Sequence, residues 1–221
     1  MIPLKSDLPT LNRPLATLAI LGLNLAVYLY QLTLSAPAEH VFFMDYGLVP
    51  GWFTGMGRPS PPPGFLPRPL TLLSAMFLHG GLLHLASNML YLWIFGPAIE
   101  DTLGRGRYLA FYLLGGLAAS LAFVFSEPAS MLPMIGASGA VATVLGGYLV
   151  LFPRARVLVL FWFFFLVQTA RVPALLLLAI WFLWQVLGLG GPGVAWMAHI
   201  GGFVAGLLMV RLFVPRRSPW Y

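Results

Sequence analysis

Six long apolar segments constrain the fold of this chain more than any other feature. They cover residues 15–34, 82–99, 108–125, 136–152, 172–189 and 194–214. A helix needs about 20 predominantly apolar residues to cross the hydrocarbon core of a bilayer. With 60% hydrophobic and only 8% charged residues, the chain is too apolar for a soluble domain. The pattern predicts an all-α, polytopic membrane protein with six transmembrane helices.

The positions of the basic residues predict the orientation of these spans. If the N-terminus is cytoplasmic and the spans alternate, ten of the 12 Lys and Arg residues lie inside, namely Lys5, Arg13, Arg105, Arg107, Arg154, Arg156, Arg171, Arg211, Arg216 and Arg217. Only Arg58 and Arg68 lie outside, a strong positive-inside bias. We therefore expect a multi-pass protein of the cell (inner or plasma) membrane. Residues 1–14 and 215–221 would be cytoplasmic tails that flank one membrane domain, residues 15–214.

Two segments between the spans need a separate interpretation. Residues 35–80 form a long connection, rich in aromatic residues and methionines, with a proline cluster from Pro59 to Pro69. Loops of this length are usually functional or disordered, and we expect this one to be ordered and partly embedded at the outer interface. The aromatic run 157–168 is too short to span. We expect it to be interfacial or re-entrant, because as a span it would place Arg171 outside.

Four polar residues reach a similar depth on three of the predicted spans. Counted from the cytoplasmic ends at about 1.5 Å per residue, Ser138 and His84 lie roughly 22 and 24 Å up, and Asn88 and His199 roughly 18 Å. His79 falls at the outer surface. Each residue alone has a structural explanation, such as a hydrogen-bonded histidine or an interhelical asparagine. Ionisable groups inside a membrane nevertheless point to function, and their shared depth favours one site.

Small residues predict that the fourth and sixth spans pack closely. His199, Gly202 and Gly206 follow one another at helical spacing, and Gly139 begins a similar stripe on the fourth span. Such stripes allow two helix backbones to approach each other. The approach would place the Ser138 hydroxyl within reach of His199.

A serine and a histidine in this arrangement indicate nucleophilic catalysis. Serine needs a base to attack at neutral pH, and histidine is the usual one. Every acidic residue lies in a tail, a loop or a span end, so the sequence predicts a Ser138–His199 dyad without a third acidic member. His84, Asn88 and the backbone N–H of Ser138 would donate hydrogen bonds to the oxyanion.

These residues occur in three motifs that together resemble the rhomboid family of intramembrane serine proteases. The motifs are His84-Leu-Ala-Ser-Asn88, Gly136-Ala-Ser138-Gly139, and Ala198-His199-Ile-Gly-Gly202-Phe-Val-Ala-Gly206, and the ending Glu100-Asp-Thr-Leu-Gly104 fits as well. The resemblance covers roughly residues 10–215 and implies the six-helix rhomboid bundle, Ser138 as nucleophile and His199 as base. Two positions depart from the family. Ala142 stands where an aromatic residue often supports the histidine ring, and the outer loop lacks the common Trp-Arg pair.

The leading functional prediction is an intramembrane serine endopeptidase that cuts transmembrane segments of other proteins near their outer end. The alternatives are a catalytically inactive rhomboid-like protein that binds membrane clients, and a channel or transporter. The inner halves of the spans have almost no ionisable groups, which disfavours a conducting path. We expect transmembrane protein substrates and the lipid bilayer as partners, and no cofactor, metal or nucleic acid.

Overall fold

The computed structural model describes residues 2–58, 66–163, 165–189, 191 and 193–215. The proline cluster lies partly, and the C-terminal tail almost wholly, outside these residues. The helices are α1 (Leu15–Gln31), α2 (Ala36–Tyr46), α3 (Pro50–Thr54), α4 (Arg68–Ser74), the 3-10 turn η1 (Ala75–Phe77), α5 (Leu82–Leu103), α6 (Arg105–Ser126), α7 (Ser138–Leu151), α8 (Ala174–Val186) and α9 (Trp196–Phe213). The strands are β1 (Ile2–Ser6), β2 (Arg156–Phe163) and β3 (Leu166–Pro173).

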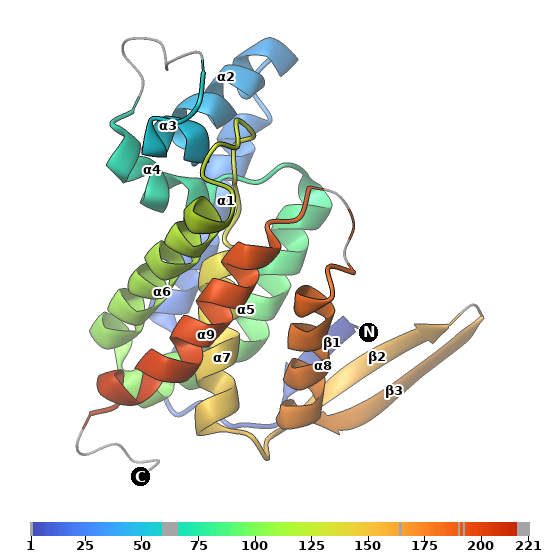
Figure 1. The fold of residues 1–221 in the computed structure, drawn as a ribbon. Helices are drawn as coiled ribbons and strands as arrows, with labels where there is room; N and C mark the ends of the chain where they lie inside the picture. Colours follow the sequence, from blue (N-terminus) through green and yellow to red (C-terminus); the bar gives the residue numbers. More distant parts are fainter. Residues whose placement is uncertain (1, 59–65, 164, 190, 192, 216–221) are drawn as a thin grey trace.

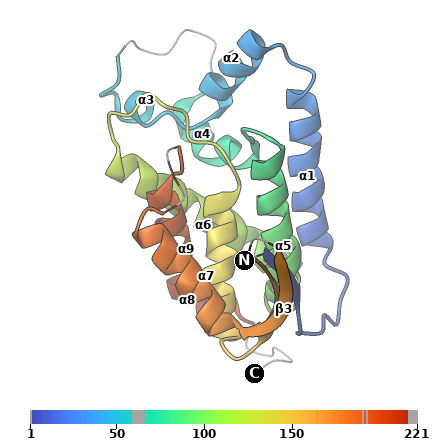
Figure 2. The same ribbon diagram turned by 90° about the vertical axis from the view of Figure 1, so that its right-hand side faces the viewer.

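The protein is a mostly helical bundle with α7 at its centre (Figures 1 and 2). Every residue of α7 from Gly139 to Tyr148 is buried, which explains why this helix consists of small and apolar residues throughout. α5, α6 and α9 surround it, with α1 outside α5. The short helices α2, α3 and α4 gather at one end of the bundle, and the strands lie beside its other end (Figure 1).

Among the described residues, three helices, α5, α6 and α9, are long and apolar enough to cross a membrane. Three shorter apolar helices, α1, α7 and α8, lie at the other predicted spans. The fifth of these is shorter than predicted, since α8 begins at Ala174 and ends at Val186. The segment 35–80 contains four short helical elements in its described part, so it is ordered there as expected.

The all-α prediction is wrong in one place, because three segments of the chain form a small sheet. β1, β2 and β3 form an antiparallel sheet in that order, and the aromatic run 157–168 supplies β2 and the start of β3. Valine, phenylalanine and tryptophan favour the pleated conformation, and Val157 and Val159 alternate into the core. Arg156 pairs with Pro173, so the hairpin returns the chain to the end of the bundle that it left.

Two carboxylates, of which Glu100 is buried, tie the start of α1 and the segment before it to the end of α5. Glu100 accepts hydrogen bonds from the backbone N–H groups of Ala16 (2.9 Å) and Thr17 (2.7 Å) and from the Thr17 hydroxyl (2.8 Å). Asp101 accepts from the backbone N–H groups of Leu11 (2.7 Å) and Asn12 (3.1 Å). Glu100 satisfies free donors at the N-terminus of α1, and Asp101 holds the segment before it; both have a structural role at the far end of α5 from His84.

Candidate active site

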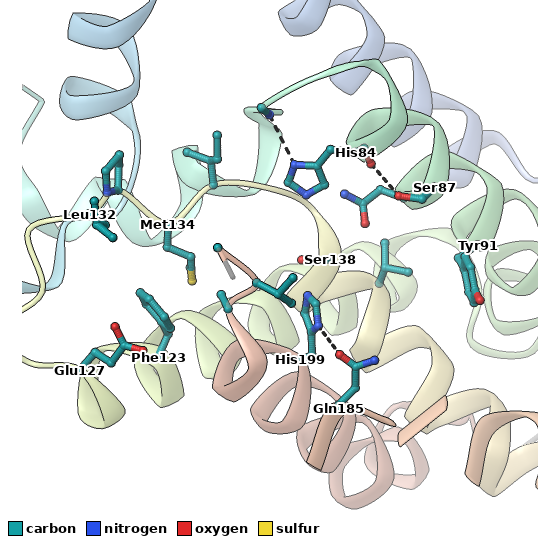
Figure 3. Close-up of a pocket in the computed structure, with 18 of the residues that line it drawn as sticks. His84, Ser87, Tyr91, Phe123, Glu127, Leu132, Met134, Ser138, Gln185 and His199 are labelled. Atoms are coloured by element: carbon teal, nitrogen blue, oxygen red, sulfur yellow. Dashed lines mark hydrogen bonds between the residues drawn. The ribbon is translucent and has the colours of Figure 1, made fainter. Parts of the chain in front are cut away.

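The four predicted polar residues line one cavity of about 770 Å³. α5 contributes His84 and Asn88, α7 contributes Ser138 as its first residue, and α9 contributes His199. In Figure 3 the Ser138 hydroxyl lies between the rings of His84 and His199. Residues from distant parts of the sequence therefore meet at one place, in agreement with their shared depth.

The position of Ser138 beside His84 requires a glycine at position 136. Gly136 has a φ of +120°, which L side chains rarely adopt. A Cβ atom on it would also lie 2.6 Å from His84 Nε2. Its backbone N–H donates to the Ala75 carbonyl at 2.8 Å, which fixes the chain just before α7. Ser138 then opens the helix, where the first-turn N–H groups have no partner within the helix.

His84 and Asn88 lie one helical turn apart and face the start of α7. The Gly80 backbone N–H lies 3.4 Å from His84 Nδ1, so Nδ1 is the acceptor and the opposite edge of the ring faces Gly136. Asn88 is buried, and its Nδ2 atom has no hydrogen-bond partner among the described residues. Nδ2 would lie 3.8 Å from a Cβ at Gly136. A buried unpaired donor beside a serine is suited to receive an oxyanion.

The His199 ring is held by side chains that the sequence analysis did not identify. Its Nδ1 atom lies 2.7 Å from Gln185 Oε1, and its ring centroid lies 6.1 Å from that of Trp181 and 6.4 Å from that of Trp196. Ala142, which we expected to leave this ring less supported, is buried in the core. The support therefore comes from α8 and α9. The sequence could have indicated Gln185, because it is the one strongly polar residue in the otherwise apolar helix α8.

No hydrogen bond joins Ser138 to His199 in the part of the chain that the structure describes. The nucleophile–base bond of a serine hydrolase is often long in the absence of substrate and tightens in the complex. The Nδ1 side of His199 is occupied by Gln185, so Nε2 is the nitrogen left for Ser138.

The glycine stripes of α7 and α9 are in direct contact. A Cβ atom on Gly202 would collide with the carbonyl oxygen of Gly139, and one on Gly206 would collide with the carbonyl oxygen of Thr143. On α7, Gly146 faces the Phe203 carbonyl in the same way. The two backbones touch along this seam, and the seam sets the separation of the helices that carry Ser138 and His199.

Two further features of the outer end were not visible in the sequence. His79, which we expected at the depth of the outer membrane surface, is fully buried within the protein, with its ring centroid 5.1 Å from that of His84. Burial, with a smaller effect from His84, lowers the pKa of His79 to about 4. A Trp–Arg contact also exists in space although not in sequence, since Arg68 Cζ lies 5.1 Å from the ring centroid of Trp52. It joins α3 to the start of α4.

Comparison with known proteins agrees with this architecture. The sequence pattern described as the Rhomboid domain matches residues 67–216. The chain belongs to the rhomboid family. Rhomboid protein 1, mitochondrial, from Saccharomyces cerevisiae is 30% identical over 200 residues, which are 86% of this chain and 51% of that protein. Rhomboid protease GluP from Bacillus subtilis is 47% identical over 79 residues, 35% of this chain and 15% of that protein.

Another relative is presenilin-associated rhomboid-like protein A, mitochondrial, from Danio rerio. It is 36% identical over 91 residues, which are 40% of this chain and 24% of that protein. The chain thus spans about half, or less, of the length of these relatives. The rhomboid resemblance noted from the motifs is confirmed.

Proposed function

We propose that this rhomboid protein is an intramembrane serine endopeptidase that hydrolyses peptide bonds in or near transmembrane segments of other proteins. The observation that carries the proposal is the meeting of Ser138, His199, His84 and Asn88 at one cavity. Nucleophile, base and oxyanion donors are the parts that acyl transfer needs. The rhomboid protease GluP among the relatives agrees with this reaction class.

The proposed reaction proceeds through an acyl-enzyme. The Ser138 hydroxyl oxygen attacks the scissile carbonyl carbon while His199 Nε2 takes its proton. Asn88, His84 and the Ser138 N–H donate hydrogen bonds to the resulting oxyanion. The C–N bond then breaks as the imidazolium returns the proton to the amine. Water, activated by the same histidine, hydrolyses the ester and regenerates the serine.

The proposed orientation follows from the helices and the charge pattern. Six apolar helices, three of them long enough alone to cross a bilayer, would span the membrane with both termini on the basic, cytoplasmic side. Substrates would be single transmembrane segments that enter from the lipid. The family resemblance implies a preference for small residues at the cut and helix-destabilising residues nearby. The cell membrane is the proposed site, although two of the relatives are named as mitochondrial.

The test compares purified wild type with single variants on a model single-span substrate. Ser138→Ala and His199→Ala should each abolish cleavage, and the double variant should be no worse than either, because one catalytic unit is being removed. Ser126→Ala, at the end of α6, is the matched control and should cleave normally. Substantial cleavage by Ser138→Ala would refute the proposed nucleophile.

An inactive, client-binding rhomboid is the second candidate, favoured by the lack of a hydrogen bond between Ser138 and His199. A fluorophosphonate probe labels only an activated serine and therefore distinguishes the two candidate functions. Labelling of wild type but not of Ser138→Ala supports the protease. Substrate binding without labelling or cleavage supports the second candidate.

A further inference from the structure

Gln185 is buried on an otherwise apolar helix. It is 7% exposed, whereas Trp184 beside it is 50% exposed, so the amide faces the bundle interior. An amide removed from water without hydrogen bonds is costly. Gln185 avoids that cost with two partners: its Nε2 atom lies 3.3 Å from the Trp181 carbonyl oxygen, and its Oε1 atom lies 2.7 Å from His199 Nδ1.

The Trp181 carbonyl fixes which end of the amide meets the histidine. A carbonyl oxygen only accepts hydrogen bonds, so the NH₂ group of Gln185 must face it. A flipped amide would place two acceptors against each other and an N–H₂ group against the ring. The amide oxygen therefore faces His199, and since it too only accepts, His199 Nδ1 must carry a proton. A neutral ring protonated at Nδ1 has its lone pair on Nε2.

We propose that Gln185 is the positioning residue for His199, holding the ring in the Nδ1–H tautomer with Nε2 free to accept the Ser138 proton. This inference rests on the proposed protease function. It assigns to a neutral side chain on α8 the orienting task that an aspartate performs in a catalytic triad. It also accounts for Ala142, because the ring is held from α8 by Gln185 and Trp181 rather than by an aromatic residue on α7.

Two substitutions at one position separate positioning from mere packing. Gln185→Leu keeps a side chain of similar size and removes the acceptor. Gln185→Glu keeps an acceptor oxygen and adds a negative charge. Trp184→Leu, on the exposed face of the same helix, is the matched control and should match wild type. The readouts are kcat and KM on the single-span substrate, the rate of fluorophosphonate labelling of Ser138, the pH–rate profile and the thermal unfolding temperature.

Gln185→Leu should lower kcat and the labelling rate by about 10- to 100-fold, the scale of a misplaced catalytic group, with little change in KM. Gln185→Glu should recover most of the activity at alkaline pH. Its acidic limb should move to higher pH, because a carboxylate beside the ring stabilises the protonated imidazolium. His84, Tyr91 and Glu127 are the other titratable groups that line the cavity, and they are the same in every variant.

The outcomes distinguish this inference from the function on which it rests. If wild type is active and Gln185→Leu keeps kcat and labelling within twofold, the positioning role is overturned and the protease stands. If Gln185→Leu does not fold, Gln185→Glu decides: an acidic limb identical to that of wild type overturns the inference. Wild type without Ser138-dependent labelling or cleavage refutes both proposals.

Discussion

Gly202 offers a sharp test of the proposed site, because it has no chemical group to contribute. It lies one turn from His199 on α9, against the backbone of α7 at Gly139. The atom that a new Cβ would meet is a main-chain oxygen, with the Gly139 carbonyl carbon 2.9 Å and the Ala119 Cβ 3.3 Å away. A backbone atom cannot rotate aside as a side chain does, so α7 and α9 must separate.

The size of the effect follows from that separation. A displacement of about 1 Å between reacting groups costs on the order of 10²-fold in rate. Overpacking a tight contact also costs about 1–3 kcal/mol of stability. For a protein of this size, that corresponds to roughly 2–4 °C of unfolding temperature per kcal/mol. We expect Gly202→Ala to impair cleavage and Gly202→Val to disable it, both with a lowered unfolding temperature.

Activity and thermal unfolding are measured together on the same preparations. Gly22→Ala is the matched control, since Gly22 lies on α1 and a Cβ there would meet nothing within 4 Å; it should be neutral or slightly stabilising. Leu208→Val, at a side chain that is 73% exposed, should be tolerated as well. Full activity in Gly202→Val would mean that α7 and α9 do not touch there, and the Ser138–His199 pairing would lose its geometric support.

Four other outcomes are expected. Asn88→Ala should lower kcat more than it changes KM in steady-state assays, because losing one oxyanion donor typically costs about 2.7–4 kcal/mol in rate. Wild type should lose thermal stability as pH falls from 6.5 toward 4. The buried His79 has a pKa below its ordinary value, so the unfolded chain binds a proton at this residue before the folded chain does. His79→Gln should lose less stability over the same pH range. Glu100→Gln should lower the unfolding temperature, because hydrogen bonds to a charged acceptor contribute about 1.5–3 kcal/mol each. Reporters fused after Arg156 and after Arg171 should lie on the same side of the membrane, and opposite sides would contradict the six-span topology.

The helical part of the fold was predictable because burial in a bilayer requires long apolar helices, and these are visible as continuous runs. The sheet was not, because the run 157–168 is apolar without helical periodicity and is too short for a span. Its strand character depends on pairing with β1 at one edge and β3 at the other. The sequence of residues 2–6 alone does not predict that they pair with β2, because strand register depends on both segments.

At the candidate site, the sequence identified the polar residues that line the cavity and missed the side chains that hold the His199 ring. Depth along a helix can be counted, so the meeting of Ser138 with His199 could be predicted. The support of the His199 ring depends on how α8 is rotated, which periodicity does not determine in a helix that is apolar on every face. The contact of Trp52 with Arg68 likewise joins residues that only the folded loop brings together.

The outer loop has a physical reason to be ordered within the proposed mechanism. The chain reaches Ser138 through a non-helical segment, and irregular backbone at membrane depth is tolerated only where its polar groups are paired or line a cavity. Leu48 and Met134 exchange backbone hydrogen bonds of 3.0 and 2.8 Å, and the Gly136 N–H is bonded to Ala75. The loop therefore pairs polar backbone groups of the segment that leads to α7. The first turn of α7 lies at the positive end of the helix dipole, which would favour the oxyanion that the proposed mechanism forms at Ser138. Because the loop bonds Met134 and Gly136, just before α7, loosening it would, in the proposed mechanism, shift the Ser138 N–H and the Ser138 hydroxyl together.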